Sequence, residues 1–180
     1  MKTVNENLSP KVSTALEERR LGGVARLYGP EAFAKFEKAH VVVVGLGGVG
    51  SWAAEALARS AIGELTIIDF DHISISNTNR QLHALEDAYG KSKVEAMQAR
   101  LKRINPDLTI NVIDDFLTPE NIEHLLKPGV AILDATDSLN SKVALAVWAK
   151  RHQAIFVMSG AAGGKVDPTK IAVDDLARTT

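Results

Sequence analysis

The 180 residues of this sequence include no cysteine. This absence excludes disulfides, thiolate zinc sites, thioester intermediates and persulfide carriage within the stretch. No apolar run approaches the ~20 residues that a membrane-spanning helix needs. The polar start MKTVNENLSPK also lacks the apolar middle of a signal peptide. We therefore expect a cytoplasmic protein that enters no membrane and whose chemistry uses no thiol of its own.

Charge of either sign is not in excess. Lys and Arg total 21, Asp and Glu total 22, and the formal net charge is −1. Such a balance argues against a chain that binds nucleic acid by bulk charge, so any RNA contact must be regional. Arg100, Lys102 and Arg103 form a basic cluster that we consider for this role, although a solvated helix face is the simpler interpretation.

Two kinds of pattern divide the chain. Residues 1–38 carry helical signals, with Pro10 and Pro30 each suited to a first helical turn and an expected break at LGG, residues 21–23. Beyond them, apolar β-branched runs alternate with helical periodicity. This alternation predicts an α/β fold, Rossmann-like and doubly wound, with a mostly parallel sheet behind an N-terminal helical extension.

The expected strands are 41–45, 65–69, 108–113, 130–134 and 155–159, and the expected helices are 49–60, 91–104, a short one after Pro119, and 139–152. A further strand is expected at 171–173. No terminal element follows it, so we expect residues 39–180 to form a domain that is truncated at its C-terminal end.

A glycine-rich turn joins the first expected strand to the helix after it. Gly45, Gly47, Gly48 and Gly50 directly follow the apolar run of residues 41–44. Glycine lets the backbone approach a phosphate closely, and the free N–H groups at the start of the helix would face that anion. The turn therefore predicts a site for the phosphates of a nucleotide.

Asp69 stands 19 residues after Gly50. In dinucleotide folds an acidic residue at an offset of ~20 residues meets a ribose hydroxyl. The glycine turn and this aspartate alone would favour a NAD-dependent oxidoreductase.

Four polar residues favour ATP chemistry instead: Asn77 and Arg80 in the long crossover, Lys93 at the start of the next helix, and Asp137 after strand 130–134. Attack on a triphosphate builds up charge that Arg, Lys and a metal-bound aspartate stabilise, whereas hydride transfer leaves such cations little to do. We expect all four at the carboxyl edge of the sheet, where ligands of open α/β sheets bind.

Each of the four also has a purely structural alternative. The alternatives are a turn at Asn77, an ion pair of Arg80 with Asp69 or Asp71, a solvated Lys93, and a helix cap formed by Asp137 with Ser138. The functional hypothesis therefore depends on the four converging on one edge.

Five motifs occur in the order GLGGVGS (45–51), IIDFDHISISNTNRQ (67–81), GKSKVEA (90–96), INPD (104–107) and LDATDS (133–138). Together they resemble the adenylyltransferase domain of the ubiquitin-activating superfamily, whose bacterial members activate carboxylates in molybdopterin and thiamine biosynthesis. Three segments are similar to one group within it, the tRNA threonylcarbamoyladenosine dehydratases: RLGGVARLYG (20–29), NTNRQLHA (77–84) and SGAAGGKVDPTKI (159–171).

The resemblance implies a role for each matching residue. The glycine loop, Ser51 included, would hold the phosphates of ATP, and Asp69 would bind the ribose. Asn77, Arg80 and Lys93 would contact the triphosphate, and Asp137 would hold Mg²⁺.

The resemblance also implies a homodimer in which an N-terminal arginine reaches the partner's site. Gly22–Gly23 replaces the usual Asn–Arg pair here, so Arg20 and Arg26 are both candidates. Members of the superfamily that contain zinc hold it through cysteine pairs. This sequence has no cysteine, so nothing in it supports a structural zinc.

The implied activity is the ATP-dependent cyclisation of N6-threonylcarbamoyladenosine in tRNA. The threonyl carboxylate would be adenylated, and the modification's own carbamoyl group would then close a ring and expel AMP. The alternatives are an adenylyltransferase that activates the C-terminus of a sulfur-carrier protein, with sulfur-relay partners, a nucleotide-sensing module without turnover, and the NAD-dependent oxidoreductase.

Overall fold

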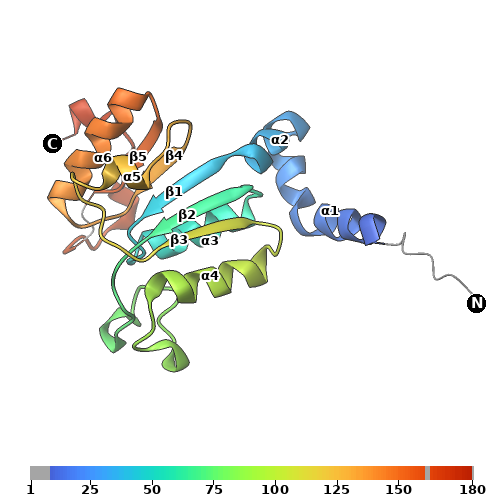
Figure 1. Ribbon diagram of the computed structural model, residues 1–180, viewed down its shortest axis with the longest axis horizontal. Helices are drawn as coiled ribbons and strands as arrows, with labels where there is room; N and C mark the ends of the chain where they lie inside the picture. Colours follow the sequence, from blue (N-terminus) through green and yellow to red (C-terminus); the bar gives the residue numbers. More distant parts are fainter. Residues whose placement is uncertain (1–8, 161–162, 180) are drawn as a thin grey trace, which may run out of the picture.

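A five-stranded sheet lies at the centre of the computed structural model, which describes residues 9–160 and 163–179, with side chains from residue 19 onward (Figure 1). The strands are β1 (His40–Val44), β2 (Glu64–Ile68), β3 (Thr109–Ile113), β4 (Ala131–Asp134) and β5 (Ile155–Met158). Their order is β3-β2-β1-β4-β5, and every neighbouring pair is parallel. The expected α/β, Rossmann-like, doubly wound sheet is confirmed.

Helices cover both faces of this sheet (Figure 1). They are α3 (Gly50–Arg59) and α4 (Lys93–Ile104) on one face, and α5 (Ile122–Leu125) and α6 (Leu139–His152) on the other. Val41 and Val43 of β1 pack into the first core, and Val42 and Val44 pack into the second. Successive side chains of a strand point to opposite faces, so a central strand buried on both faces reads as a continuous apolar run.

The N-terminal extension differs from expectation in the position of its break. Helix α1 (Ser9–Tyr28) runs straight through LGG, and the chain turns at Gly29, whose φ is +83°, before α2 (Pro30–Lys38). A glycine inside a helix costs only about 1 kcal/mol relative to alanine, too little to end a long helix. Pro30 is at the start of α2 as expected. Helix α1 packs against α2 and points away from the sheet (Figure 1).

The strand expected at 171–173 is absent. A single 3-10 turn covers Pro168–Lys170, and the side chains of Ile171 and Val173 are exposed. Strand propensity depends on a neighbour that supplies hydrogen bonds and packing, and this segment has none within the described residues. Residues 1–8 of the expected extension, and 161–162 and 180 of the expected domain, lie outside the described residues. No helix in the described part of the chain has both the length and the apolar composition to cross a bilayer.

Candidate active site

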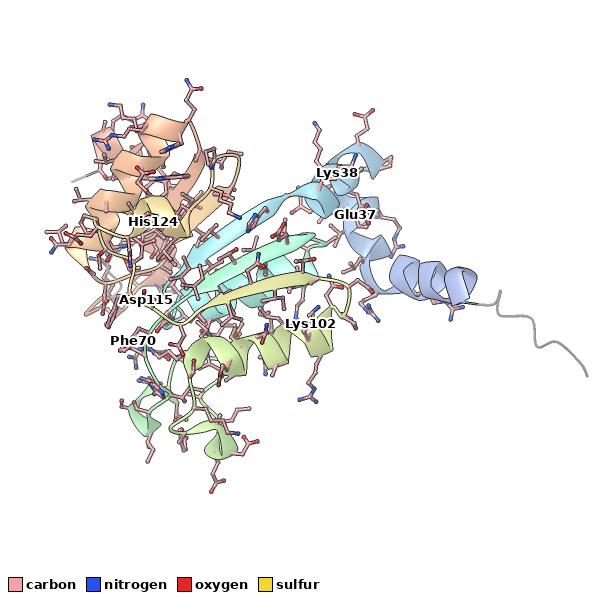
Figure 2. All side chains as sticks on the ribbon, in the orientation of Figure 1. Glu37, Lys38, Phe70, Lys102, Asp115 and His124 are labelled. Carbon is pink, nitrogen blue, oxygen red and sulfur yellow. The ribbon has the colours of Figure 1, made fainter. Side chains whose placement is uncertain are left out.

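A cavity of about 770 Å³ opens at the carboxyl ends of the central strands. Its wall is built by the glycine loop after β1, the crossover after β2, and the loops that follow β3, β4 and β5. Of the residues expected from the sequence, the wall brings together Gly45, Gly47, Gly48, Asp69, Asn77, Arg80, Lys93 and Asp137. Figure 2 shows Phe70 and Asp115 at this end of the sheet and Lys102 toward the other end.

The glycine loop contains two kinds of glycine. Gly45 has a φ of +87°, and a Cβ there would come within 2.9 Å of the Ala135 carbonyl. A Cβ at Gly50 would overlap the carbonyl oxygen of Gly45. These two positions therefore let α3 and the loop after β4 pack directly against the loop backbone. A Cβ at Gly47 would meet nothing within 4 Å, so this residue faces the open cavity.

Ser51 lies behind the loop. Its fully buried hydroxyl donates to the Gly47 carbonyl at 2.7 Å and accepts from the Leu82 N–H at 3.3 Å. Neither Ser51 nor Gly50 is part of the cavity wall. Ser51 thus ties the glycine loop to the crossover, and its side chain is not presented to a ligand.

Asp69 follows β2 and is fixed by backbone donors. Its carboxylate accepts from the N–H groups of Leu46 and Asp71. Burial raises the pKa of Asp69, while these two hydrogen bonds and the charge of Lys93 oppose that rise. The carboxylate is therefore an immobile acceptor on the cavity wall, suited to a hydroxyl donor such as ribose.

Lys93 is the first residue of α4, and it is only 5% exposed. Its Nζ donates to Asp71 Oδ2 at 2.7 Å and lies 3.9 Å from Asp69 Oδ1. The structure therefore excludes the solvated alternative for this lysine. The wall holds a buried cation between two carboxylates.

Arg80 forms no ion pair with Asp69 or Asp71 among the residues described. Its Nη1 donates to the Ser76 carbonyl and to Asn79 Oδ1, both at 3.0 Å. Its aliphatic stem lies over the glycine loop, since a Cβ at Gly48 would be 3.0 Å from Arg80 Cγ. In the described part of the chain, its guanidinium group thus has only neutral acceptors.

Asn77 has the structural role that its alternative proposed, and it also lies on the cavity wall. Its Oδ1 accepts from the Ser74 N–H at 3.0 Å in a capping box that closes one short turn of the crossover. Asp137 is exposed, and its carboxylate forms no hydrogen bond or ion pair with the described residues. Ser138 alone caps α6, through a hydrogen bond from the Ser141 N–H.

The donor set at Asp137 suits magnesium held jointly with a ligand. No group of three or more histidine or acidic side chains within the described ranges is arranged to hold a metal by itself. Mg²⁺ binds through one or two carboxylates together with substrate phosphates, so a single free carboxylate beside a phosphate site fits this ion.

The cavity wall also contains an aromatic pair, Phe70 and Phe116, that the sequence patterns do not indicate. The rings of Phe70 and Phe116 have centroids 4.6 Å apart, and the residues are 47% and 57% exposed. Phe70 directly follows Asp69, and Phe116 comes after β3 beside Asp115. The one sequence signal for this pair is that each phenylalanine comes shortly after a parallel strand, at the edge of the sheet where ligands bind.

The N-terminal arginine candidates lie far from this cavity within one subunit. Arg20 Nη1 is 3.4 Å from Asp107 Oδ2, just before the start of β3 and thus at the opposite end of the sheet. Arg26 is exposed on α1. Neither residue belongs to the cavity wall.

The basic cluster considered for RNA is largely engaged within the chain. Arg100 Nε donates to the Glu55 carboxylate. Lys102 Nζ donates to the carbonyls of Pro106 and Leu108, at 3.1 and 2.7 Å. Only Arg103 is left for solvent or a partner among these three, so the simpler interpretation is favoured.

Residues 19–178 match the model of the ThiF family. The chain is 50% identical over 162 residues to the tRNA threonylcarbamoyladenosine dehydratase of Escherichia coli K12 and 48% identical over 163 residues to that of Haemophilus influenzae. These matches cover 89% and 90% of this chain but 60% and 62% of the relatives. The chain thus spans about three fifths of their length.

Solved structures agree with these matches. The crystal structure of the E. coli tRNA N6-threonylcarbamoyladenosine dehydratase TcdA in complex with ATP is similar with a TM-score of 0.88 and 50% identity, covering 90% of this chain and 67% of that one. E. coli MccB with ATP is similar with a TM-score of 0.66 and 27% identity, covering 71% of this chain and 38% of that one.

Proposed function

Because this chain belongs to the ThiF family, we propose that it is the nucleotide-binding part of an enzyme that uses ATP to adenylate a carboxylate. The observation that carries this proposal is the joint placement of an open glycine loop, fixed Asp69, buried Lys93 and exposed Asp137 around one cavity. The substrate we propose is N6-threonylcarbamoyladenosine of tRNA. Relatives that share about half of the residues bear the name of this dehydratase, and the structure of one of them contains ATP.

The cavity wall offers a separate contact for each part of ATP. The phosphates would lie against the open backbone at Gly47, and the ribose hydroxyls would donate to Asp69. Phe70 and Phe116 would contact the adenine, because exposed aromatic faces stack well on bases. Lys93 and Arg80 would stabilise the charge that develops on the phosphates during the reaction.

Adenylation makes ring closure feasible. A carboxylate is a poor electrophile, because hydroxide or oxide is a poor leaving group. In the proposed reaction the threonyl carboxylate oxygen attacks the α-phosphorus and pyrophosphate leaves. The carbamoyl group of the same modification then attacks the acyl carbon, and AMP leaves, so the net change is the loss of water. This second nucleophile belongs to the substrate, which is compatible with a chain without cysteine.

The cavity wall carries more acidic than basic side chains, so a bound triphosphate would need additional cations. Of the wall residues that the structure describes, Asp69, Asp71, Asp115 and Asp137 are acidic, and Arg80 and Lys93 are basic. A triphosphate would meet more negative than positive charge there.

We therefore propose that Asp137 and the phosphates hold Mg²⁺, which neutralises phosphate charge when bound. We also propose that Arg20 or Arg26 of a second copy enters the site of a homodimer. The direction of α1, away from its own sheet, supports this second proposal (Figure 1).

The test of the activity is ATP–pyrophosphate exchange and AMP release with tRNA that carries the modification. We expect Lys93→Ala and Asp137→Ala each to lower both rates by about 10²-fold or more, as is typical when one charge-stabilising contact is removed. Lys38→Ala, at the opposite end of the sheet (Figure 2), is the matched control and should keep the wild-type rates. Wild-type rates in both site variants would contradict the assignment.

The choice of nucleotide is tested by calorimetry. We expect ATP with magnesium to bind the folded chain, and a clear preference for NAD would support the oxidoreductase instead. A cytoplasmic location and sulfur-relay partners stay predictions from the sequence.

A further inference from the structure

A buried carboxylate outside the expected site organises the loop that carries Asp137. Asp134 is the last residue of β4 and is 0% exposed. Its Oδ1 accepts from both donors of Thr136, the backbone N–H at 2.9 Å and the hydroxyl at 2.7 Å. Asp134 thus fixes the first turn of the loop, immediately before Asp137.

Lys142 of α6 completes this arrangement. Its Nζ donates to Asp134 Oδ2 at 3.1 Å and to the Ser159 carbonyl at 2.9 Å. The Ser159 N–H in turn donates to the Asp134 carbonyl at 2.9 Å. One ammonium group therefore joins the end of β4 to the end of β5, where both loops enter the cavity wall.

Stability alone does not account for a buried ion pair at this position. Desolvation of two charges offsets much of their attraction, and apolar residues of similar volume serve a core as well or better. The pair does hold two wall segments, 135–138 and 159–160, in one fixed relation. The first of them also packs against the glycine loop, where Gly45 leaves no room for a Cβ beside Ala135.

We propose that Asp134 and Lys142 are positioning residues, which set where Asp137 is presented to the cavity and how far it lies from the segment that begins at Ser159. The value of this placement for catalysis rests on the proposed function, in which Asp137 acts on the ATP–magnesium complex. The placement itself does not depend on that function.

Amide hydrogen exchange tests the placement without any assay of activity. Lys142→Met removes the ammonium, and Lys142→Arg keeps a cation with several donors. We expect exchange of the hydrogen-bonded amides of Ala135, Thr136 and Ser159 to rise about tenfold or more in Lys142→Met, and to stay within about threefold of wild type in Lys142→Arg. Exchange in β1 and β2 should not change in either variant. Unchanged exchange in both loops of Lys142→Met, or an equal rise across the whole sheet, would overturn the proposal.

Thr136→Val provides a second, milder variant if Lys142→Met does not fold. It removes only the hydroxyl that donates to Asp134, and Thr136→Ser retains that hydroxyl. We expect faster exchange of the amide of residue 136, which donates to Asp134, in the valine variant than in the serine variant. Equal exchange in the two would overturn the proposal.

Nucleotide measurements on the same variants separate this proposal from the proposed function. Lys142→Met should raise the Mg²⁺ concentration needed for half-maximal ATP binding by about tenfold, with a smaller change in the affinity for ATP at saturating Mg²⁺. If the wild-type chain binds no ATP, the proposed function fails, and the exchange data still decide the positioning role. If ATP binds and the Mg²⁺ requirement is unchanged in Lys142→Met, the positioning role fails alone.

Discussion

The burial of His83 predicts that the folded chain loses stability in mild acid. This histidine is 3% exposed, and neither ring nitrogen has a hydrogen-bond partner among the described residues. Burial is the main cause that lowers its pKa from 6.5 to about 4, and the nearby charges of Lys93 and Arg100 contribute to the same shift. The imidazole is therefore neutral in the folded chain at neutral pH and resists protonation.

The size of the effect follows from proton linkage. Between pH 6.5 and 4 the unfolded chain binds a proton at this residue while the folded chain does not, so stability falls as the pH falls through this window. From pH 7 to pH 5 the two pKa values give a loss of about 2 kcal/mol in the free energy of unfolding. Asp69, whose pKa is raised by burial, acts in the opposite direction. A variant is therefore needed to isolate the contribution of His83.

Urea unfolding of the wild type and His83→Leu at pH 7 and pH 5 makes this comparison. We expect the wild type to lose about 2 kcal/mol more than the variant between the two pH values. At pH 7 the variant should be at least as stable, because two unpaired buried nitrogens are removed. His124 is an exposed residue of α5 (Figure 2), so His124→Leu is the control for removing a histidine that is not buried. An equal loss in wild type and His83→Leu would refute a neutral, buried His83.

Three further predictions concern the glycine loop and the aromatic pair. Gly50→Ala should cost about 2–4 kcal/mol in urea unfolding, because its Cβ overlaps the Gly45 carbonyl oxygen, and a cost below about 1 kcal/mol would contradict this packing. Gly47→Ala should leave stability within about 1 kcal/mol of wild type but weaken ATP binding about tenfold or more in calorimetry, because its Cβ enters open space where phosphates would lie. Phe116→Ala should weaken ATP binding by about 1–3 kcal/mol and leave inorganic triphosphate binding unchanged, whereas equal losses for both ligands would exclude adenine stacking.

The sheet could be predicted because its signals are local. The apolar run of β1 is long enough to be buried on both faces, and Pro30 marks the start of a helix by its own backbone geometry. The two wrong predictions also concern local signals, at 21–23 and 171–173. Glycine inside an otherwise helical segment costs too little to end α1. The apolar residues at 171–173 have no paired neighbour among the residues that the structure places.

Only those site residues at the end of a predicted strand or just after it could be placed from the sequence. Asp69 and Asp137 follow parallel strands, so the carboxyl-edge rule brings them to one cavity without any knowledge of side-chain contacts. The ion pair of Asp134 with Lys142, which lies behind the wall, depends on tertiary packing. Lys142 reaches Asp134 from the first turn of α6, and nothing in the spacing of these residues distinguishes that contact from a solvated lysine.

The two cations of the wall differ in the groups that hold them, and this difference favours different tasks for them in the proposed reaction. Lys93 is buried between Asp71 and Asp69, so a phosphate can approach it only by competing with two carboxylates. Arg80 is held by two neutral acceptors, which cost little to replace with a charged phosphate oxygen. Its stem already lies over Gly48, beside the open loop. In the proposed reaction, we therefore expect Arg80 to turn toward the triphosphate as it binds, and Lys93 to contribute a fixed positive charge that needs no reorganisation.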